Sequence, residues 1–472
     1  MVRGADDDAD GAAASRRRLL RRGLALGVGA LSGCSLFDGA GVGERSVTPA
    51  PLDDGTATDA PVGPGREPGR RTPPNGAERT PETATPTETR TESPAPPEGW
   101  PVVQADGARS GWRPNGSGPN PSTATTVGPA WSVEVGGPVR GSVAVVDGSA
   151  YVGTDEGTVA ALPVSGPDAS VGGGSATSAE PVAVEWTYET AGAIRATPTV
   201  AAGVVYCGDE RGTLAAVDAD GGGERWTFSI AGERPGPTAL RSGPAVADGA
   251  AYVGATDGRV YAVDAADGSE RWRFDAGGFL GVVAPVALAG GRVFAGSYAG
   301  RVYAIDADTG SEAWRYAGTG GTRAWFGPTV AEGVVYAGAS PGGIAAVDAF
   351  DGTERWRRDT DAPVFSSPAV ADETLFVGTD GGVVLALGTE DGAVRWRRAV
   401  DGAVKSSPAV VDGRVYVGTD GGSVFAFDAA DGARRWTVGL DGPVRSSPAV
   451  VEGRVFVGDT SGTVHALAAT ER

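Results

Sequence analysis

Most of the chain repeats one short phrase. In it an Ala is followed by Asp two residues later, by Gly six residues later and by Trp ten residues later. Copies recur every 40 to 46 residues and start at Ala216, Ala262, Ala304, Ala346, Ala386 (with Gly388 in the Asp position) and Ala426. Self-similarity at this period is typical of stacked supersecondary units, and here it indicates four-stranded propeller blades.

The unit from Lys405 to Trp436 shows how one blade is built. Asp-Gly pairs at 412–413, 420–421 and 431–432 are hairpin-turn signals, because Gly accepts the positive φ that tight turns require. Short runs of β-branched and aromatic residues between them have the length of strands. The unit therefore predicts an antiparallel meander of four strands. Pro408 places its first strand at an edge, facing a central channel.

Two landmarks count the units. The proline of the first strand, or its equivalent, occurs eight times, at Val143, Pro198, Pro244, Pro285, Pro328, Pro368, Pro408 and Pro448. The first tryptophan precedes any first strand, and the last unit stops at Leu467 before any fourth strand. We therefore predict an all-β, eight-bladed β-propeller of four-stranded antiparallel blades over residues 99–472. An N-terminal strand around Trp131 would close the ring and remove the exposed edges.

Eight of the eleven tryptophans occupy equivalent positions, one in every blade. Each is followed by a new blade, so the indoles are expected to lie between neighbouring sheets and to bury ~150–250 Å² each. Their equal spacing around the ring argues against stacking platforms for bases or sugars. We predict a structural docking role for Trp131, Trp186, Trp226, Trp272, Trp314, Trp356, Trp396 and Trp436.

The N-terminus has the order of an export signal. Residues 15–21 (Ser-Arg-Arg-Arg-Leu-Leu-Arg) resemble a twin-arginine signal, and residues 31–34 (Leu-Ser-Gly-Cys) resemble a lipoprotein cleavage box. The apolar run between them is shorter than the ~20 residues that span a bilayer. Residues 1–34 are thus predicted to direct twin-arginine export and to place lipid on Cys34, on the outer face of the cytoplasmic membrane. The alternative is a basic tail with a chance cysteine.

Residues 35–98 are rich in Pro, Thr, Glu and Gly and hold hardly an aromatic residue. Such a segment cannot bury enough apolar surface to offset its ordering entropy, so we predict a disordered tether. Whether its threonines carry sugars is left open by the sequence.

The charge balance is strongly acidic. The net charge is -19, and Lys405 is the only lysine. This composition predicts a halophilic protein solvated in concentrated salt, and it disfavours nucleic acid as a partner. Only Cys207 lies within the predicted ring, where its expected role is that of a small buried hydrophobe.

The repeated Ala-Asp-Gly-Trp phrase resembles the tryptophan-docking motif of pyrroloquinoline-quinone-type (PQQ-like) propellers. That superfamily includes quinoprotein dehydrogenases and eight-bladed outer-membrane-assembly lipoproteins. The resemblance spans roughly residues 100–468, and residues 100–101 and 106–112 look like the lead-in found ahead of such rings. It implies the propeller fold and leaves two classes of function, a PQQ-dependent oxidoreductase or an assembly scaffold.

The residues that the dehydrogenase class implies are not found. Those enzymes pair PQQ with calcium, which is held by carboxylate and Asn ligands, and use an Asp base and often a disulfide of adjacent cysteines. This chain has no Asn after Asn120 and no adjacent cysteine pair. We therefore expect no cofactor and no metal. His465 is the only histidine, so a metal site or a Ser-His-Asp triad is not expected, and we assign it a structural role.

One non-periodic feature remains. Three residues before each first-strand proline, adjacent blades of the closed ring carry cations in the order Lys405, Arg445, Arg140, Arg195 and Arg241. Val282, Trp325 and Phe365 complete the circle. These positions predict a pocket at one channel mouth for a small anion or an acidic partner segment, with Trp325 and Phe365 as its apolar wall. The competing interpretation is that nearby Asp and Glu side chains pair with the cations.

Three functions follow from these observations. The leading hypothesis is a lipid-anchored extracellular propeller that acts as a non-catalytic binding or assembly scaffold for other envelope proteins. The second is a sensor or accessory subunit that binds an anionic ligand at the cationic mouth. The third is a PQQ-dependent oxidoreductase.

Overall fold

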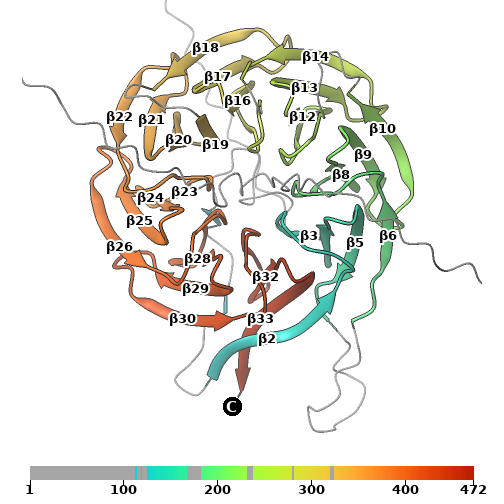
Figure 1. The fold of residues 1–472 in the computed structure, drawn as a ribbon, viewed down its shortest axis with the longest axis vertical. Helices are drawn as coiled ribbons and strands as arrows, with labels where there is room; N and C mark the ends of the chain where they lie inside the picture. Colours follow the sequence, from blue (N-terminus) through green and yellow to red (C-terminus); the bar gives the residue numbers. More distant parts are fainter. Residues whose placement is uncertain are drawn as a thin grey trace, which may run out of the picture.

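The computed structural model describes residues 112–113, 118–119, 125–166, 182–230, 238–278, 281–318 and 324–471. These residues form eight sheets arranged in a ring around a central axis (Figure 1). The predicted signal, Cys34 and the predicted tether lie outside the described residues. Within the described part of the chain, no helix has the length and hydropathy needed to cross a bilayer.

Each blade runs from an innermost strand, here called A, through B and C to an outermost strand D. Blade 1 holds β3 (Ala144–Val146), β4 (Ser149–Gly153), β5 (Thr158–Pro163) and β6 (Trp186–Glu189). Blade 2 holds β7 (Thr199–Ala201), β8 (Val204–Gly208), β9 (Thr213–Asp218) and β10 (Glu224–Ser229). Blade 3 holds β11 (Ala245–Ala247), β12 (Ala250–Gly254), β13 (Arg259–Asp264) and β14 (Glu270–Asp275). Blade 4 holds β15 (Ala287–Ala289), β16 (Arg292–Ser297), β17 (Arg301–Asp306) and β18 (Glu312–Ala317).

The second half of the ring repeats this order. Blade 5 holds β19 (Ala324–Ala331), β20 (Val334–Ser340), β21 (Gly343–Asp348) and β22 (Glu354–Arg358). Blade 6 holds β23 (Ala369–Ala371), β24 (Thr374–Gly378), β25 (Val383–Gly388) and β26 (Val394–Ala399). Blade 7 holds β27 (Ala409–Val411), β28 (Arg414–Gly418), β29 (Ser423–Asp428) and β30 (Arg434–Gly439). Blade 8 holds β31 (Ala449–Val451), β32 (Arg454–Gly458), β33 (Thr463–Glu471) and, as its strand D, β2 (Thr125–Glu134).

The ring closes through β2, as the sequence predicted. This strand pairs antiparallel with β33 from Thr125 opposite Glu471 to Glu134 opposite Thr463, and it brings Trp131 opposite Ala466. Figure 1 shows β2 and β33 crossing the seam where the two ends of the folded chain meet. Because the first strand of the ring completes the last sheet, β33 is not left as an open edge, and β2 takes the outermost position that strand D holds in the other blades.

A row of hydrogen bonds fastens the closing strand. Ser132 Oγ lies 2.8 Å from His465 Nδ1, and His465 Nε2 lies 3.2 Å from Asp459 Oδ2. Asp459 also accepts hydrogen bonds from the Ser461 and Thr463 amides. Ser132, His465 and Asp459 thus form a hydrogen-bonded row, which the sequence analysis did not expect. It joins β2 and β33 to the turn before β33.

The repeated phrase is explained by how tryptophan docks. In blade 3, Tyr252, Ala262 and Trp272 are cross-strand neighbours, so the indole lies beyond the small Ala with its ring 5.8 Å from that of Tyr252. Across the blade boundary, Trp272 Nε1 donates to Ala307 O at 2.8 Å. Gly310 has a φ of 71°, and a Cβ there would lie 2.7 Å from Trp272 Cδ2. Only Gly suits this position.

This arrangement recurs around the ring with two exceptions. The indole N–H bonds a carbonyl of the next blade in seven of the eight positions. Trp436 Nε1 is buried without a hydrogen-bond partner among the described residues. The cause is the seam, because blade 8 joins β33 to β2 and has no C–D turn. Trp186 is only partly buried, whereas the other seven indoles are buried.

A short segment before the ring lies at the edge of blade 7. Strand β1 (Trp112–Arg113) pairs in parallel with the innermost strand β27, with Trp112 opposite Val410 and Arg113 opposite Val411. Blade 7 is therefore a five-stranded sheet whose inner edge is covered. This addition within the predicted lead-in was not part of the sequence prediction.

Replacing a docking tryptophan should destabilise the ring. We expect Trp272→Ala to lower the free energy of unfolding by about 3–5 kcal/mol, because it removes a buried indole between two blades. Trp272→Phe should lower the free energy of unfolding by about 0.5–1.5 kcal/mol more than Trp436→Phe does, because Trp272 makes an indole hydrogen bond and Trp436 makes none among the described residues. Denaturant unfolding curves measure both differences. Equal losses for the two Phe variants would contradict the assigned hydrogen bond.

Acid should weaken the seam. Burial raises the pKa of Asp459, but the hydrogen bonds from His465, Ser461 and Thr463 outweigh it and lower the pKa to about 2 from 3.8. At pH values above the pKa that Asp459 has in the unfolded chain, its charged carboxylate therefore stabilises the folded state. This contribution is lost as the pH falls from about 4 to about 2. We expect Asp459→Asn to be destabilising at pH 5 and nearly neutral at pH 2. Unfolding free energies of both proteins across this range test the expectation, and a constant difference would refute it.

Candidate functional site

The candidate site lies at the end of the channel where every strand A begins. The segments that lead into strand A carry the predicted cations, and the turns between strands B and C face them. Two backbone bonds hold the B–C turn between two blades in blades 1, 2, 3, 6, 7 and 8. In blade 7, Asp420 N donates to Ala403 O of its own blade at 2.9 Å. Val444 N of blade 8 donates to Thr419 O at 2.8 Å. In these blades the B–C turn is held between the lead-in segments of two neighbouring blades.

The structure brings the five predicted cations to one place. A small cavity of about 80 Å³ in the channel is lined by residues of seven blades, among them Arg140, Arg195, Arg241, Lys405, Arg445 and Phe365. A cavity of this size holds a few water molecules or one small ionic group.

On one side of the mouth, the arginines contact two acidic residues of the B–C turns. Asp155 accepts from Arg140 Nε at 2.7 Å and from Arg195 Nε at 3.1 Å. Glu210 accepts two bonds of 2.7 Å from Arg241 Nε and Nη2, and its Oε2 lies 3.9 Å from Arg195 Nη1. Each carboxylate therefore sits between two guanidinium groups.

The other side repeats this pattern around Asp420. Its Oδ2 lies 3.0 Å from Lys405 Nζ, and its Oδ1 lies 2.7 Å from Arg445 Nε. Lys405 also lies 3.9 Å from Asp380, and its side chain is only 5% exposed. Burial raises the pKa of Asp420, but the hydrogen bonds from Arg445 and Lys405 outweigh it and leave the pKa below its usual value. The carboxylate is therefore ionised at neutral pH.

The five cations form an arc along the mouth, and acidic side chains of the B–C turns pair with them, as the competing interpretation of the sequence predicted. The acidic partners Asp155, Glu210, Asp380 and Asp420 were missed as a group. They could have been found, because each lies two residues after the glycine that ends strand B.

Of the two residues predicted to form the apolar wall, only Phe365 lines the cavity. Phe365 lines the cavity and packs edge-to-face on Phe326, with ring centroids 4.9 Å apart. Trp325 is instead 1% exposed and packs on Tyr316 in the core between blades 4 and 5. The reason is that β19 begins earlier than other A strands, so Trp325 and Phe326 project to opposite faces. Phe326 is the residue that joins Phe365.

A belt of hydroxyl groups lines the cavity beside the cations. Ser407 N donates to Ser447 Oγ at 2.9 Å, and Ser447 N donates across the seam to Ser142 Oγ at 2.8 Å. Ser142 N continues the belt to Thr197 Oγ1 at 2.8 Å. The sequence signal is a Ser or Thr directly before the strand-A proline in blades 2, 6, 7 and 8, which the sequence analysis did not use. The belt joins the inner edges of blades 7, 8, 1 and 2, which carry four of the five cations.

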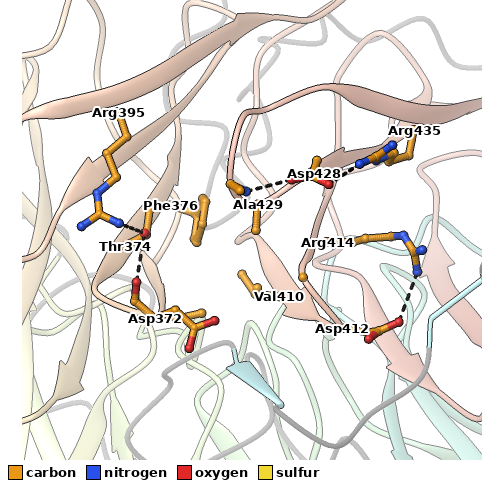
Figure 2. A pocket seen from close by; sticks show the side chains of 13 residues that line it. Asp372, Thr374, Phe376, Arg395, Val410, Asp412, Arg414, Asp428, Ala429 and Arg435 are labelled. Atoms are coloured by element: carbon orange, nitrogen blue, oxygen red, sulfur yellow. Dashed lines mark hydrogen bonds and ion pairs between the residues drawn. The ribbon is translucent and has the colours of Figure 1, made fainter.

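A larger groove of about 740 Å³ opens at the other end of the strands, between blades 6 and 7 (Figure 2). Its three arginines contact acidic or hydroxyl side chains nearby. Arg395 Nη1 donates to Thr374 Oγ1 at 2.5 Å, and Arg414 lies 3.5 Å from Asp412. Arg435 is paired with Asp428 (Figure 2). The groove is polar and mixed in charge, and none of the sequence-predicted site residues lies in it.

The described cavity at the mouth is small in comparison with PQQ. That cofactor is a tricyclic molecule with three carboxylates, and pockets for ligands of such size typically measure ~300–1,000 Å³. The cavity is far smaller, and the carboxylates at its mouth are bound to basic side chains. Among the described ranges there is no group of three or more His, Cys, Asp or Glu residues placed to hold a metal ion. Burial, and then Asp209, raise the pKa of the Cys207 thiol to about 12.

Several solved structures share this fold at low sequence identity. BamB from Moraxella catarrhalis has a TM-score of 0.58 at 18% identity, with 73% of this chain and 98% of that chain covered. Quinohemoprotein alcohol dehydrogenase from Comamonas testosteroni has a TM-score of 0.64 at 15% identity, covering 79% and 81%. A europium-containing methanol dehydrogenase has a TM-score of 0.65 at 15% identity, covering 78% and 91%. These likenesses establish the fold and do not choose between the two classes.

The sequence itself gives the family. None of the curated protein sequences matches this chain significantly. The family profile described as outer membrane protein assembly factor BamB matches residues 122–274, 256–368 and 340–471, which together span the whole ring. This chain therefore belongs to the BamB family of PQQ-like β-propellers.

Proposed function

We propose that this protein is a lipid-anchored extracellular scaffold that binds other envelope proteins and has no catalytic activity of its own. The observation that carries the proposal is the match of the complete ring to the BamB assembly-factor family. The solved BamB of Moraxella catarrhalis supports it, because nearly all of that chain is covered by this one.

The chemistry of the channel favours this function over quinone-dependent oxidation. The small cavity and the paired carboxylates at the mouth do not suit PQQ with calcium. A mouth of alternating charge suits a polar protein surface, because matched charges orient a partner and reject wrong ones. The mixed-charge groove between blades 6 and 7 offers a second surface of the same kind (Figure 2).

The anchor and the tether complete the proposal. Lipid on Cys34 would hold the chain at the membrane, and residues 35–98 would separate the ring from it. A flexible segment of this length reaches on the order of 40 Å. The ring could therefore contact membrane-embedded partners from a distance while its channel mouth stays accessible.

The anchor can be tested by cell fractionation in the native host. We expect the unaltered protein to sediment with membranes and to be released by detergent. Cys34→Ala should still be exported but should appear in the medium, because it lacks the site for lipid. Replacing Arg16 and Arg17 by Lys should keep the protein inside the cell, since the twin-arginine route reads these residues. Membrane attachment of Cys34→Ala would overturn the proposed anchor.

The scaffold can be tested by quantitative co-purification after membrane solubilisation. We expect one or more envelope proteins to co-purify in near-stoichiometric amounts. Arg195→Glu with Arg445→Glu should reduce the yield by at least about tenfold, because like charges then face each other at the mouth. The matched control is Arg225→Glu with Arg271→Glu, two arginines of the D strands β10 and β14 that pair with Asp218 and Asp264. A protein that elutes alone while retaining a small anion would favour the sensor hypothesis instead.

A further inference from the structure

The hydroxyl belt of the cavity accepts hydrogen bonds but donates none among the described residues. Ser367 N donates to Ser407 Oγ at 3.0 Å, and the belt continues from amide to hydroxyl through the next three blades. A hydroxyl group has one hydrogen to donate and two lone pairs. Each belt oxygen therefore has an amide partner, whereas its hydrogen has no acceptor in the part of the chain that the structure describes. The four belt residues are Ser407, Ser447, Ser142 and Thr197.

The serines directly before two of these positions behave differently. Ser446 Oγ donates to Gly458 O and accepts from Gly458 N, both at 2.8 Å. Ser406 makes the same two contacts with Gly418. The four belt residues are also buried, at 5% to 7% exposure. Buried donors are almost always satisfied in folded proteins, so the four hydrogens require an acceptor that the described chain does not supply.

The cavity of about 80 Å³ lies where these hydrogens can reach. All four belt residues line it, and a hydroxyl hydrogen can turn about its C–O bond to point inward. Lys405, Arg445 and Arg241 also line the cavity, whereas no Asp or Glu is among the described residues around it. Their acidic partners, Asp420 and Glu210, contact them from the B–C turns. The lining thus offers donors and positive charge, which favour an anion over a cation.

The cations keep donors for such a ligand after pairing with their acids. Arg445 contacts Asp420 through Nε and Nη2, and Arg241 contacts Glu210 through the same two nitrogens. A guanidinium has five N–H groups, so the two on Nη1 remain in each side chain after these contacts. Lys405 has three N–H groups, of which Asp420 Oδ2 at 3.0 Å can accept one.

We propose that this cavity binds one chloride ion. A monatomic anion suits a small lining made of donors, because it accepts hydrogen bonds from every side and brings no donor that would need a partner. The ion accepts from hydroxyl groups of adjacent blades and from N–H groups of the cations beside them. It thereby ties the inner edges of blades 7, 8, 1 and 2 together across the seam. The proposal goes beyond the scaffold function and does not depend on it.

Melting temperatures test the site when chloride replaces gluconate at constant ionic strength. Gluconate is the control anion because it is too large for the cavity. A bound ion stabilises the folded state in proportion to ln(1 + [L]/Kd). We expect the melting temperature to rise with chloride concentration, and bromide to act in the same way. A melting temperature that is the same in chloride and in gluconate overturns the proposal.

Two double variants separate the site from general salt effects. Ser142→Ala with Ser447→Ala removes two belt hydrogens, and the apparent chloride Kd should rise by at least about tenfold, because each lost bond is to a charged acceptor. Ser406→Ala with Ser446→Ala is the matched control, since it removes two buried hydroxyls that are not part of the cavity lining. It should melt at a lower temperature but keep the chloride Kd of the unaltered protein. Equal chloride Kd values in the two double variants contradict the proposal.

Bromide locates the ion directly. Crystals of the unaltered protein soaked in bromide should give an anomalous difference peak in the cavity, in contact with the belt hydroxyls. A peak at that position supports the site even if Ser142→Ala with Ser447→Ala fails to fold. Ordered water alone in the cavity, or bromide only on the outer surface of the ring, overturns the proposal.

Discussion

The pairing of β2 with β33 is the constraint on which the rest of the structure depends. It turns a linear array of sheets into a ring, and it brings Arg140 and Arg195 of the first blades beside Arg445 of the last. An array that stayed open would separate these residues and would leave strand edges exposed. The hydroxyl belt crosses the same seam from Ser447 to Ser142, so the inner and outer ends of the last blade are both fastened.

The periodic features could be predicted from the sequence because each answers a local physical need. The Ala of the repeated phrase leaves room for an indole, and the Gly takes a positive φ where a Cβ would strike the neighbouring Trp. These needs recur in every blade, so the repeat predicted the number of blades and the docking of the tryptophans. The offset between Trp131 and the first strand A likewise predicted the closing strand.

The non-periodic features were harder to predict. The cations of the mouth were located, but their acidic partners lie in another turn, and only the fold brings the two together. Trp325 was misplaced because an earlier start of β19 exchanges the faces of neighbouring side chains. The pairing of β1 with β27 depends on a free edge that no local pattern marks. The seam differs from other blade boundaries at Trp436, and this difference exists only because the ring closes there.

The most direct test of ring closure is amide hydrogen exchange of the strands that meet at the seam. Peptides that cover residues 125–134 and 463–471 should exchange as slowly as the ladder between β29 and β30 inside blade 7. Both should lose protection together when Asp459 is replaced by Asn. Rapid exchange of residues 125–134 in the unaltered protein, with blade 7 still protected, would mean that the ring is open and would contradict this account.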